Sequence, residues 1–260
     1  LVAHDYTCVV YDQYVDSDGK IKRKFSNTYS PGTTFKNEHS SLSNYCGVLW
    51  FHHWKQDITI GCAVIDVCTG NTHLYEYSVP YYPMPSTFDD LERFLSIYCP
   101  SELICISNST AFDVHTLILQ LYHNHCKLHI IRLKPLNDDA SSDSAIRDKF
   151  IEKAMNCEKQ CYINTMIETF YKTCNTHIFR ELFLQHTIAT QALCYLLDFI
   201  DTHNPDLISN LKEPKYETMQ GFLLLANHSL QQLNIIEPNR HAQKPHNGPR
   251  CVLDILDKCK

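Results

Sequence analysis

The sequence lacks any run of about 18 consecutive apolar residues, so nothing in it predicts a membrane-spanning helix. An excess of positive charge is missing too, since 23 Lys and Arg stand against 29 Asp and Glu, for a net charge of −6. A chain of this charge does not coat nucleic acid by general electrostatic attraction, so any contact with DNA must be local or indirect. Internal repeats and low-complexity tracts are also absent, which excludes solenoid folds.

Two motifs of nucleotide-binding and hydrolytic enzymes are missing as well. No G-x-x-x-x-G-K-[ST] occurs, so a P-loop for ATP is excluded within these residues. No G-x-S-x-G occurs either, so the sequence has no motif for the strained turn that usually presents a serine nucleophile. We therefore predict no catalytic and no cofactor-binding residue in this segment, and whether the protein is an enzyme stays open.

The composition is that of a globular chain, with 44% hydrophobic and 20% charged residues. Its 260 residues exceed the usual size of one domain, which predicts more than one compact unit. The 13 cysteines are odd in number and scattered, which favours buried thiols in a reducing intracellular compartment over a disulfide framework. Nuclear, cytoplasmic, viral-factory and organellar locations all remain open. The start at Leu1 and the helical apolar pattern that reaches Lys260 suggest a piece of a longer protein.

The first half of the sequence predicts strands. Residues 7–11 and 20–29 read as a hairpin around a turn at 16–19, and a polar linker follows at 36–44. Three apolar runs are then separated by short turns and must pair antiparallel as a meander. These runs are residues 46–51, 58–67 and 72–77.

Helices then begin to alternate with strands. Residues 88–98 predict a helix capped by Ser86 or Thr87 and stopped by Pro100. The following segments read as a strand, a helix and a strand, at 103–106, 110–122 and 128–133. The order β-β-β-α-β-α-β predicts a mixed sheet with parallel pairing in its later strands, which is typical of ribonuclease-H-like domains.

A loop at 135–144 ends the strand-rich part, and helices follow. Apolar positions in residues 179–200 keep one face, which predicts a single long helix of about six turns. A turn at 202–205 ends it. The predicted fold class is therefore α/β plus all-α.

Metal-dependent nuclease activity is disfavoured, because a two-metal site needs a carboxylate on the first sheet strand. Residues 46–51 contain no Asp or Glu, and Asp66 and Glu92 are isolated. Asp66 is better explained as the cap of the turn at Thr69 and Gly70. A zinc site is disfavoured as well, because the histidines and thiols lack paired ligand spacing. The residues considered for zinc were His52 and His53 with His73, then His123, His125 and Cys126 with His129, and Cys157 with Cys161.

One basic cluster stands out near the N-terminus. Lys20, Lys22, Arg23 and Lys24 are candidates for contact with DNA phosphates. The alternative is a charged hairpin that serves solubility or protects a sheet edge.

Several fragments resemble a known family in the family's own order. Residues 28–33, which include Pro31, Gly32 and Thr33, resemble the TPGT segment that joins the mismatch-recognition and connector domains of MutS-family DNA mismatch repair proteins. Residues 61–70, with Asp66, are similar to the connector signature G-x-A-x-x-D-x-x-T-G, which ends at Thr69 and Gly70 here. Residues 98–104 resemble the family's P-x-E-I/L step from helix to strand.

The second half continues this resemblance in a divergent form. Residues 189–196 resemble the start of the long lever helices, and 248–257 resemble the opening of the next core helix. Leu225, Ser229 and Leu233 fit the pattern L-D-x-x-T-x-x-N-L-E-L. Three positions depart from that pattern, namely Ala226, Gln232 and Asn234. Such divergence suggests a giant-virus or organelle-type member.

The resemblance implies three parts. Residues 1–38 would be the remnant of the mismatch-recognition domain, 39–145 the ribonuclease-H-like connector, and 146–260 the start of the helical lever core. A full-length member would bind DNA as a homo- or heterodimer, use ATP and Mg²⁺, and recruit a MutL-type partner. This segment would couple mismatch binding to ATPase-driven movement, through the helix at 179–200 and the linkers at 36–44 and 137–144.

Mismatch preference and a further nuclease domain stay open. The alternatives to a coupling segment are a ribonuclease-H-like nuclease relative and a non-enzymatic protein-interaction module.

Overall fold

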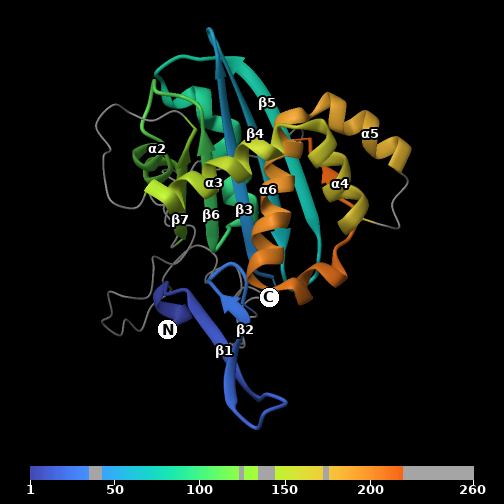
Figure 1. The fold of residues 1–260 in the computed structure, drawn as a ribbon. Coiled ribbons are helices and arrows are strands. Elements are labelled where there is room, and N and C mark those ends of the chain that lie inside the picture. Colours follow the sequence, from blue (N-terminus) through green and yellow to red (C-terminus); the bar gives the residue numbers. More distant parts are fainter. Residues whose placement is uncertain (35–42, 123–125, 134–143, 172–175, 219–260) are drawn as a thin grey trace, which may run out of the picture. The chain divides into compact units, whose positions relative to one another are not determined.

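The computed structural model describes residues 1–34, 43–122, 126–133, 144–171 and 176–218 (Figure 1). The chain separates into two compact units, Leu1–Thr218 and Met219–Lys260. The second unit lies outside the described residues, and with it the motif positions Leu225, Ser229 and Leu233. Most of both predicted linkers also lies outside them. The description below concerns the first unit.

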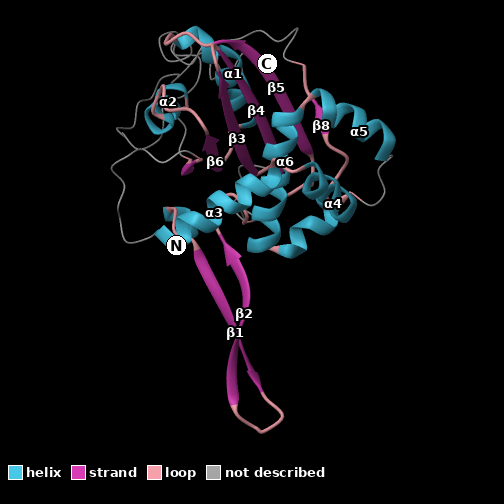
Figure 2. Cartoon of the chain, turned by 45° about the horizontal axis from the view of Figure 1, so that its top comes forward, coloured by secondary structure: helices cyan, strands magenta, loops and turns pink. Residues whose placement is uncertain are grey.

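An N-terminal hairpin forms a two-stranded sheet of its own (Figure 2). Strands β1 (Cys8–Val15) and β2 (Ile21–Tyr29) pair antiparallel, as the sequence predicted. Gly19 closes the turn between them at φ +73°, a left-handed conformation that glycine adopts without strain.

The central sheet has six strands in the order β7-β6-β3-β4-β5-β8. The predicted antiparallel meander of β3, β4 and β5 is confirmed, and so is the parallel pairing of β6 and β7. Lys55 at φ +56° allows a tight turn, so β3 and β4 run longer than predicted. The strands are β3 (Tyr45–Trp54), β4 (Asp57–Asp66), β5 (Thr72–Pro80), β6 (Glu102–Ser107), β7 (Lys127–Arg132) and β8 (Lys215–Tyr216).

Helices follow the meander and dominate the second half. None of those in the described part of the chain is long and apolar enough to cross a membrane. Short 3-10 helices cover Val2–His4, Pro85–Phe88 and Pro205–Asn210. The α-helices are α1 (Asp89–Tyr98), α2 (Val114–Leu121), α3 (Ser144–Cys157), α4 (Gln160–Phe170), α5 (Thr176–Gln185) and α6 (Thr187–His203).

Helix α6 lies on one face of the sheet, against β3 and β4 (Figure 1). Val48 and Trp50 of β3 share this core with residues of α3, α4 and α6. On the other face, Phe94 of α1 stacks on Tyr75 of β5 at 6.1 Å between ring centroids. Because both faces are covered, β3 is buried over residues 46–51, which accounts for the uninterrupted apolar run there.

Five cysteines in the described part of the chain are buried. Burial raises the pKa of these thiols, that of Cys157 to about 12 and the others further. They are therefore protonated at neutral pH. They are Cys46, Cys62, Cys105, Cys157 and Cys194.

The prediction of one long helix over 179–200 is wrong. The structure has two helices, α5 and α6, which are separated at His186. The first turn of a helix has backbone N–H groups without internal partners. Glu76 of β5 supplies an acceptor, because its Oε2 lies 2.8 Å from the backbone nitrogen of Ala189. The start of α6 is thereby fixed on the sheet, and this tertiary contact overrides the helical period.

The predicted cap of the first helix is also wrong. Phe88 occupies the N-cap of α1 and makes no side-chain cap. The hydroxyl of Thr87 donates instead to the backbone carbonyl of Tyr82 at 2.8 Å. Ser86 lies within the preceding 3-10 helix.

The second helix is shorter than the predicted range of 110–122. Helix α2 begins only at Val114, because the side chain of Asp113 accepts from the backbone nitrogen of Thr116 at 3.0 Å and caps it.

We expect Gly61→Ala to destabilise the fold, because a Cβ there would lie 2.4 Å from the backbone nitrogen of Ala189 and from the carbonyl carbon of Ile188. Overpacking against a backbone that cannot turn aside should lower the free energy of unfolding by about 3 kcal/mol. Urea denaturation followed by circular dichroism measures this.

The matched control is Gly47→Ala, whose Cβ would meet ends of side chains at 3.0 Å (Val64) and 3.1 Å (Leu103). These side chains can shift, so its loss should be clearly smaller. Equal losses would refute the close packing of α6 on Gly61.

Candidate functional site

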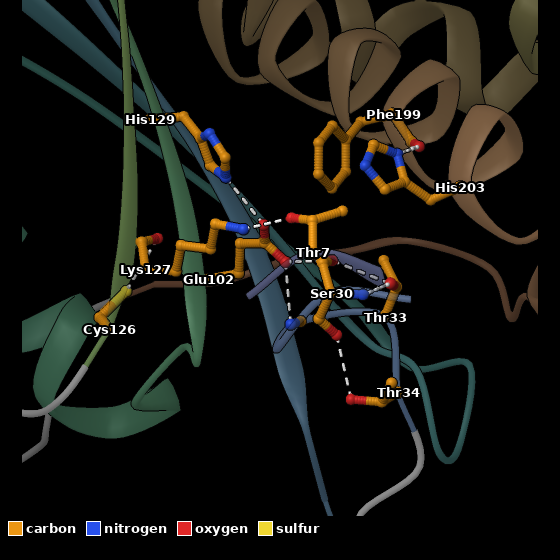
Figure 3. Close-up of polar contacts among 11 residues, drawn as sticks. Thr7, Ser30, Thr33, Thr34, Glu102, Cys126, Lys127, His129, Phe199 and His203 are labelled. Carbon is orange, nitrogen blue, oxygen red and sulfur yellow. Dashed lines mark hydrogen bonds and ion pairs between the residues drawn. The ribbon is translucent and has the colours of Figure 1, made fainter. Parts of the chain in front are cut away.

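A buried carboxylate joins the N-terminal segment to the central sheet (Figure 3). Glu102 is the first residue of β6, and its side chain is 1% exposed. Its Oε2 accepts from the hydroxyl of Ser30 and, at 2.9 Å, from the backbone nitrogen of Gly32. Its Oε1 lies 2.7 Å from Nε2 of His129 on β7. Because an ionised carboxylate can only accept, this Nε2 donates the hydrogen bond. We call these four residues the Glu102 joint.

The turn that follows β2 is shaped for this contact. Its backbone closes from Thr33 N to the carbonyl of Ser30 at 3.1 Å, and the Thr33 hydroxyl accepts from Ser30 N at 3.0 Å. A Cβ on Gly32 would lie 2.6 Å from the Cβ of Glu102. Glycine is therefore required here for the close approach of the turn to the side chain of Glu102.

Asn44 ties this turn to two further segments. Its Nδ2 donates to the carbonyls of Pro31 at 2.9 Å and Thr34 at 2.8 Å. Its backbone nitrogen donates to Oδ1 of Asp66 at 3.0 Å, and its Oδ1 accepts from the hydroxyl of Ser101 at 2.5 Å. The end of β4 and the start of β6 are thus bound to the same turn.

Asp66 organises the turn at the end of β4. Its Oδ1 accepts from the backbone nitrogen of Cys68 at 3.0 Å, and its Oδ2 accepts from the hydroxyl of Thr69 at 2.6 Å. Gly70 donates to the Asp66 carbonyl at 2.8 Å and has φ +72°. The interpretation of Asp66 as a turn cap is confirmed.

On its other side, the Glu102 joint reaches the C-terminal end of α6. The ring of His129 lies 6.1 Å from that of Phe199, which lies 4.0 Å from the ring of His203. Nδ1 of His203 is 2.8 Å from the Phe199 carbonyl and donates to it. Burial lowers the pKa of His203, which favours the neutral imidazole at neutral pH.

The charge of Glu102 is held by its partners. Burial by itself raises the pKa of this carboxyl, but the hydrogen bonds from His129, Ser30 and Gly32 outweigh burial and hold the pKa below its ordinary value. The carboxylate is therefore ionised at neutral pH. Hydrogen bonds to a charged group contribute about 1.5–3 kcal/mol each, so the joint is a strong attachment.

This arrangement joins separate segments and does not have the hydrogen-bond pattern that activates a serine nucleophile. In a Ser-His-Asp triad the hydroxyl is hydrogen-bonded to the imidazole, whereas Ser30 donates to the carboxylate of Glu102. Across the described residues, no group of three His, Cys, Asp or Glu side chains is placed to hold a metal ion.

Six of the motif positions named from the sequence lie in the described residues, and they meet in this network although they come from separate segments. Pro31, Gly32 and Thr33 supply the turn that contacts Glu102 and Asn44. The other three of these six supply the turn at the end of β4, which Asn44 joins to the turn at Pro31. They are Asp66, Thr69 and Gly70.

The basic cluster is exposed on the hairpin and divides between its two faces. Lys22 and Lys24 face Tyr14 and Asp12 across the strands, while Arg23 alternates to the opposite face. Lys22 also forms an ion pair with Asp16. Lys20 lies just before β2.

The histidines considered for zinc lie apart. His52 is opposite Thr59 and His73 opposite Val64, in different halves of β4. His73 contacts Glu217 at 2.7 Å, and His129 belongs to the Glu102 joint. His123 and His125 are outside the described residues.

Sequence reasoning missed the central residues of the site. Glu102 occurred only within the P-x-E fragment, whose third position could have singled it out. Asn44 has no sequence signal, because it bonds to segments 13, 22 and 57 residues away.

We expect Glu102→Gln to lower the free energy of unfolding at pH 7 by about 3 kcal/mol, because it removes a buried, hydrogen-bonded charge. The folded-state pKa of Glu102 lies below the unfolded value of about 4.3. Its stabilisation is therefore complete above about pH 5 and is lost as the pH falls through the folded pKa. Urea titrations from pH 7 to pH 3 should show the wild type and the variant converging.

The control for this titration is Glu152→Gln, which removes an exposed carboxylate on α3 and should shift stability little at any pH. A difference for Glu102→Gln that stayed constant down to pH 3 would contradict the assigned charge.

Comparison with known proteins gives one informative match. No protein-family model matches the chain. The chain is similar to an Acanthamoeba polyphaga mimivirus protein named "Putative DNA mismatch repair protein mutS homolog", with 24% identity over 274 aligned positions. The alignment covers 99% of this chain but 24% of the relative, so the chain spans about a quarter of that protein.

The match extends along nearly the whole chain, including the motif fragments that the Glu102 joint and Asn44 bring together. The relative comes from a giant virus, in agreement with the type of member that the divergent motifs suggested. The predicted resemblance is confirmed, because the chain is similar along nearly its whole length to a viral protein that is named as a MutS homolog.

Proposed function

We propose that this chain is a coupling segment of a MutS-type protein, in which it links binding of mismatched DNA to ATPase-driven conformational change. One observation carries the proposal. Three family-like fragments that are far apart in the sequence meet in a single buried hydrogen-bond network around Glu102 and Asn44. Such a network transmits displacement of one segment to the others, because packed elements move as bodies.

The fold supports a ribonuclease-H-like connector at 39–145. Its sheet order β7-β6-β3-β4-β5, with three antiparallel and two parallel strands, fits that architecture. We assign 1–38 to the remnant of a mismatch-recognition domain and 146–260 to the start of the lever core. Helix α6 of the latter part packs on β3 and β4, so movement of the lever would carry the connector sheet with it.

The remaining parts of the proposal concern the whole protein. DNA would be its partner, a MutL-type protein would dock on it, and ATP with Mg²⁺ would bind outside these residues in a homo- or heterodimer. The name of the viral relative, a mismatch repair protein, supports DNA as the partner. The buried thiols support an intracellular, reducing location.

No specific observation favours the two alternatives. A nuclease would need carboxylates at the sheet that are free to bind metal ions. Asp66 instead accepts hydrogen bonds within its turn, and Glu102 accepts hydrogen bonds within the Glu102 joint. A metal-dependent nicking assay would detect one. A DNA-independent interaction module would be separated from the coupler by pull-down with and without DNA.

We expect Glu102→Gln, in the longer protein that carries this segment, to separate the two activities. Affinity for a mismatched duplex should stay close to that of the wild type, while the stimulation of ATP hydrolysis by mismatch falls at least about fivefold, the lower range of allosteric coupling. Fluorescence anisotropy and steady-state phosphate release measure the two quantities. Glu152→Gln serves as control, and normal stimulation in Glu102→Gln would argue against the coupling role.

We further expect contact between the hairpin and DNA phosphates to depend on the face that carries Lys22 and Lys24. The double variant Lys22→Ala/Lys24→Ala should reduce the slope of log affinity against log salt by about 2, because each phosphate contact contributes about 0.9. Arg23→Ala, on the opposite face, should leave the slope unchanged. A slope that is the same in all three proteins would exclude this face as a DNA contact.

A further inference from the structure

The hairpin is attached to the central sheet at both ends of its base. At the end of β2, Ser30 and Gly32 donate to Glu102. At the start of β1, the hydroxyl of Thr7 accepts from the ammonium group of Lys127 (Figure 3). Glu102 and Lys127 are direct register partners on the neighbouring strands β6 and β7. The two attachment points therefore lie side by side on one row of the sheet.

The two attachments differ in kind. Glu102 and Ser30 are buried, Gly32 lies against the side chain of Glu102, and Asn44 adds two hydrogen bonds to the same turn. The contact between Lys127 and Thr7 is a single hydrogen bond in an exposed position. Water competes for an exposed ammonium group but not for a buried, fully bonded carboxylate. The second attachment must therefore open far more readily than the first.

The two strands of the hairpin form a single rigid piece. Strands β1 and β2 are held together by their own ladder, so the hairpin moves as one body when one base contact opens. Besides the Glu102 joint, β2 also lies against α6. When the contact at the start of β1 opens, the hairpin stays held on the β2 side of its base and rotates about that side.

We propose that the hairpin β1–β2 pivots on the Glu102 joint, and that the contact between Lys127 and Thr7 is a releasable stop that sets its resting orientation. Release of the stop allows the hairpin to swing while the turn at Ser30 and Thr33 stays bound. This device belongs to the chain itself and does not depend on whether the hairpin contacts DNA.

Distance measurements by electron paramagnetic resonance test the device in the 260-residue chain. Ketone-bearing amino acids at Ser17, in the hairpin turn, and at Gln120, exposed on α2, accept spin labels without reaction at the 13 cysteines. Hydrogen exchange of the Gly32 amide reports the joint separately. The wild type should give one narrow distance distribution and a protected Gly32 amide.

Lys127→Ala and Thr7→Val should both broaden the distance distribution and leave the protection of Gly32 unchanged. Glu102→Gln should lower the protection of Gly32 itself. Arg132→Ala is the control, because it removes an ion pair with Asp113 at the opposite end of β7 and should leave both readouts at wild-type values. A narrow distribution in both stop variants would overturn the proposal, and so would a loss of Gly32 protection equal to that of Glu102→Gln.

Discussion

A carboxylate removed from water must be satisfied by the protein around it, and the burial of Glu102 imposes this requirement on two other segments, the turn after β2 and strand β7. The hydroxyl of Ser30, the backbone of Gly32 and the ring of His129 meet it. An unbonded charge in this position would cost several kcal/mol, so these segments assemble together or not at all. The N-terminal turn is therefore part of the fold of the sheet, although its hairpin forms a sheet of its own.

Helix α6 is positioned by a second requirement of the same kind. Its first backbone N–H groups need acceptors, and Glu76 provides one. The helix can approach β4 closely enough because Gly61 has no side chain there. The far end of the helix brings Phe199 to His129, beside Glu102. One helix thus touches the sheet at its start and the N-terminal joint at its end. Two distant parts of the chain share a rigid element, which is the physical basis of the proposed coupling.

Local patterns in the sequence predicted most of the strands and the turn at Asp66, because those features depend on neighbouring residues. Strands β3 and β4 are recognisable since both faces of the sheet are covered, and the Asp66 turn is closed within four residues. The break at His186 was not predictable, because Glu76, which fixes the start of α6, bonds to a residue 113 positions away. The role of Asn44 was hidden for the same reason. The motif positions were found through the resemblance to a family. The contacts between them were visible only in the structure.

The five buried thiols of the described residues can report local opening of the structure through their reactivity. A protonated thiol shielded by packing does not react with an alkylating reagent. Cys46, Cys62 and Cys105 in the sheet, and Cys157 and Cys194 in helices α3 and α6, therefore become reactive only when their surroundings open. The two groups lie in different elements, and their rates of modification would separate opening of the sheet from lifting of the helices. The proposed movement of rigid parts could thus be followed separately for the sheet and for the helices through their own cysteines.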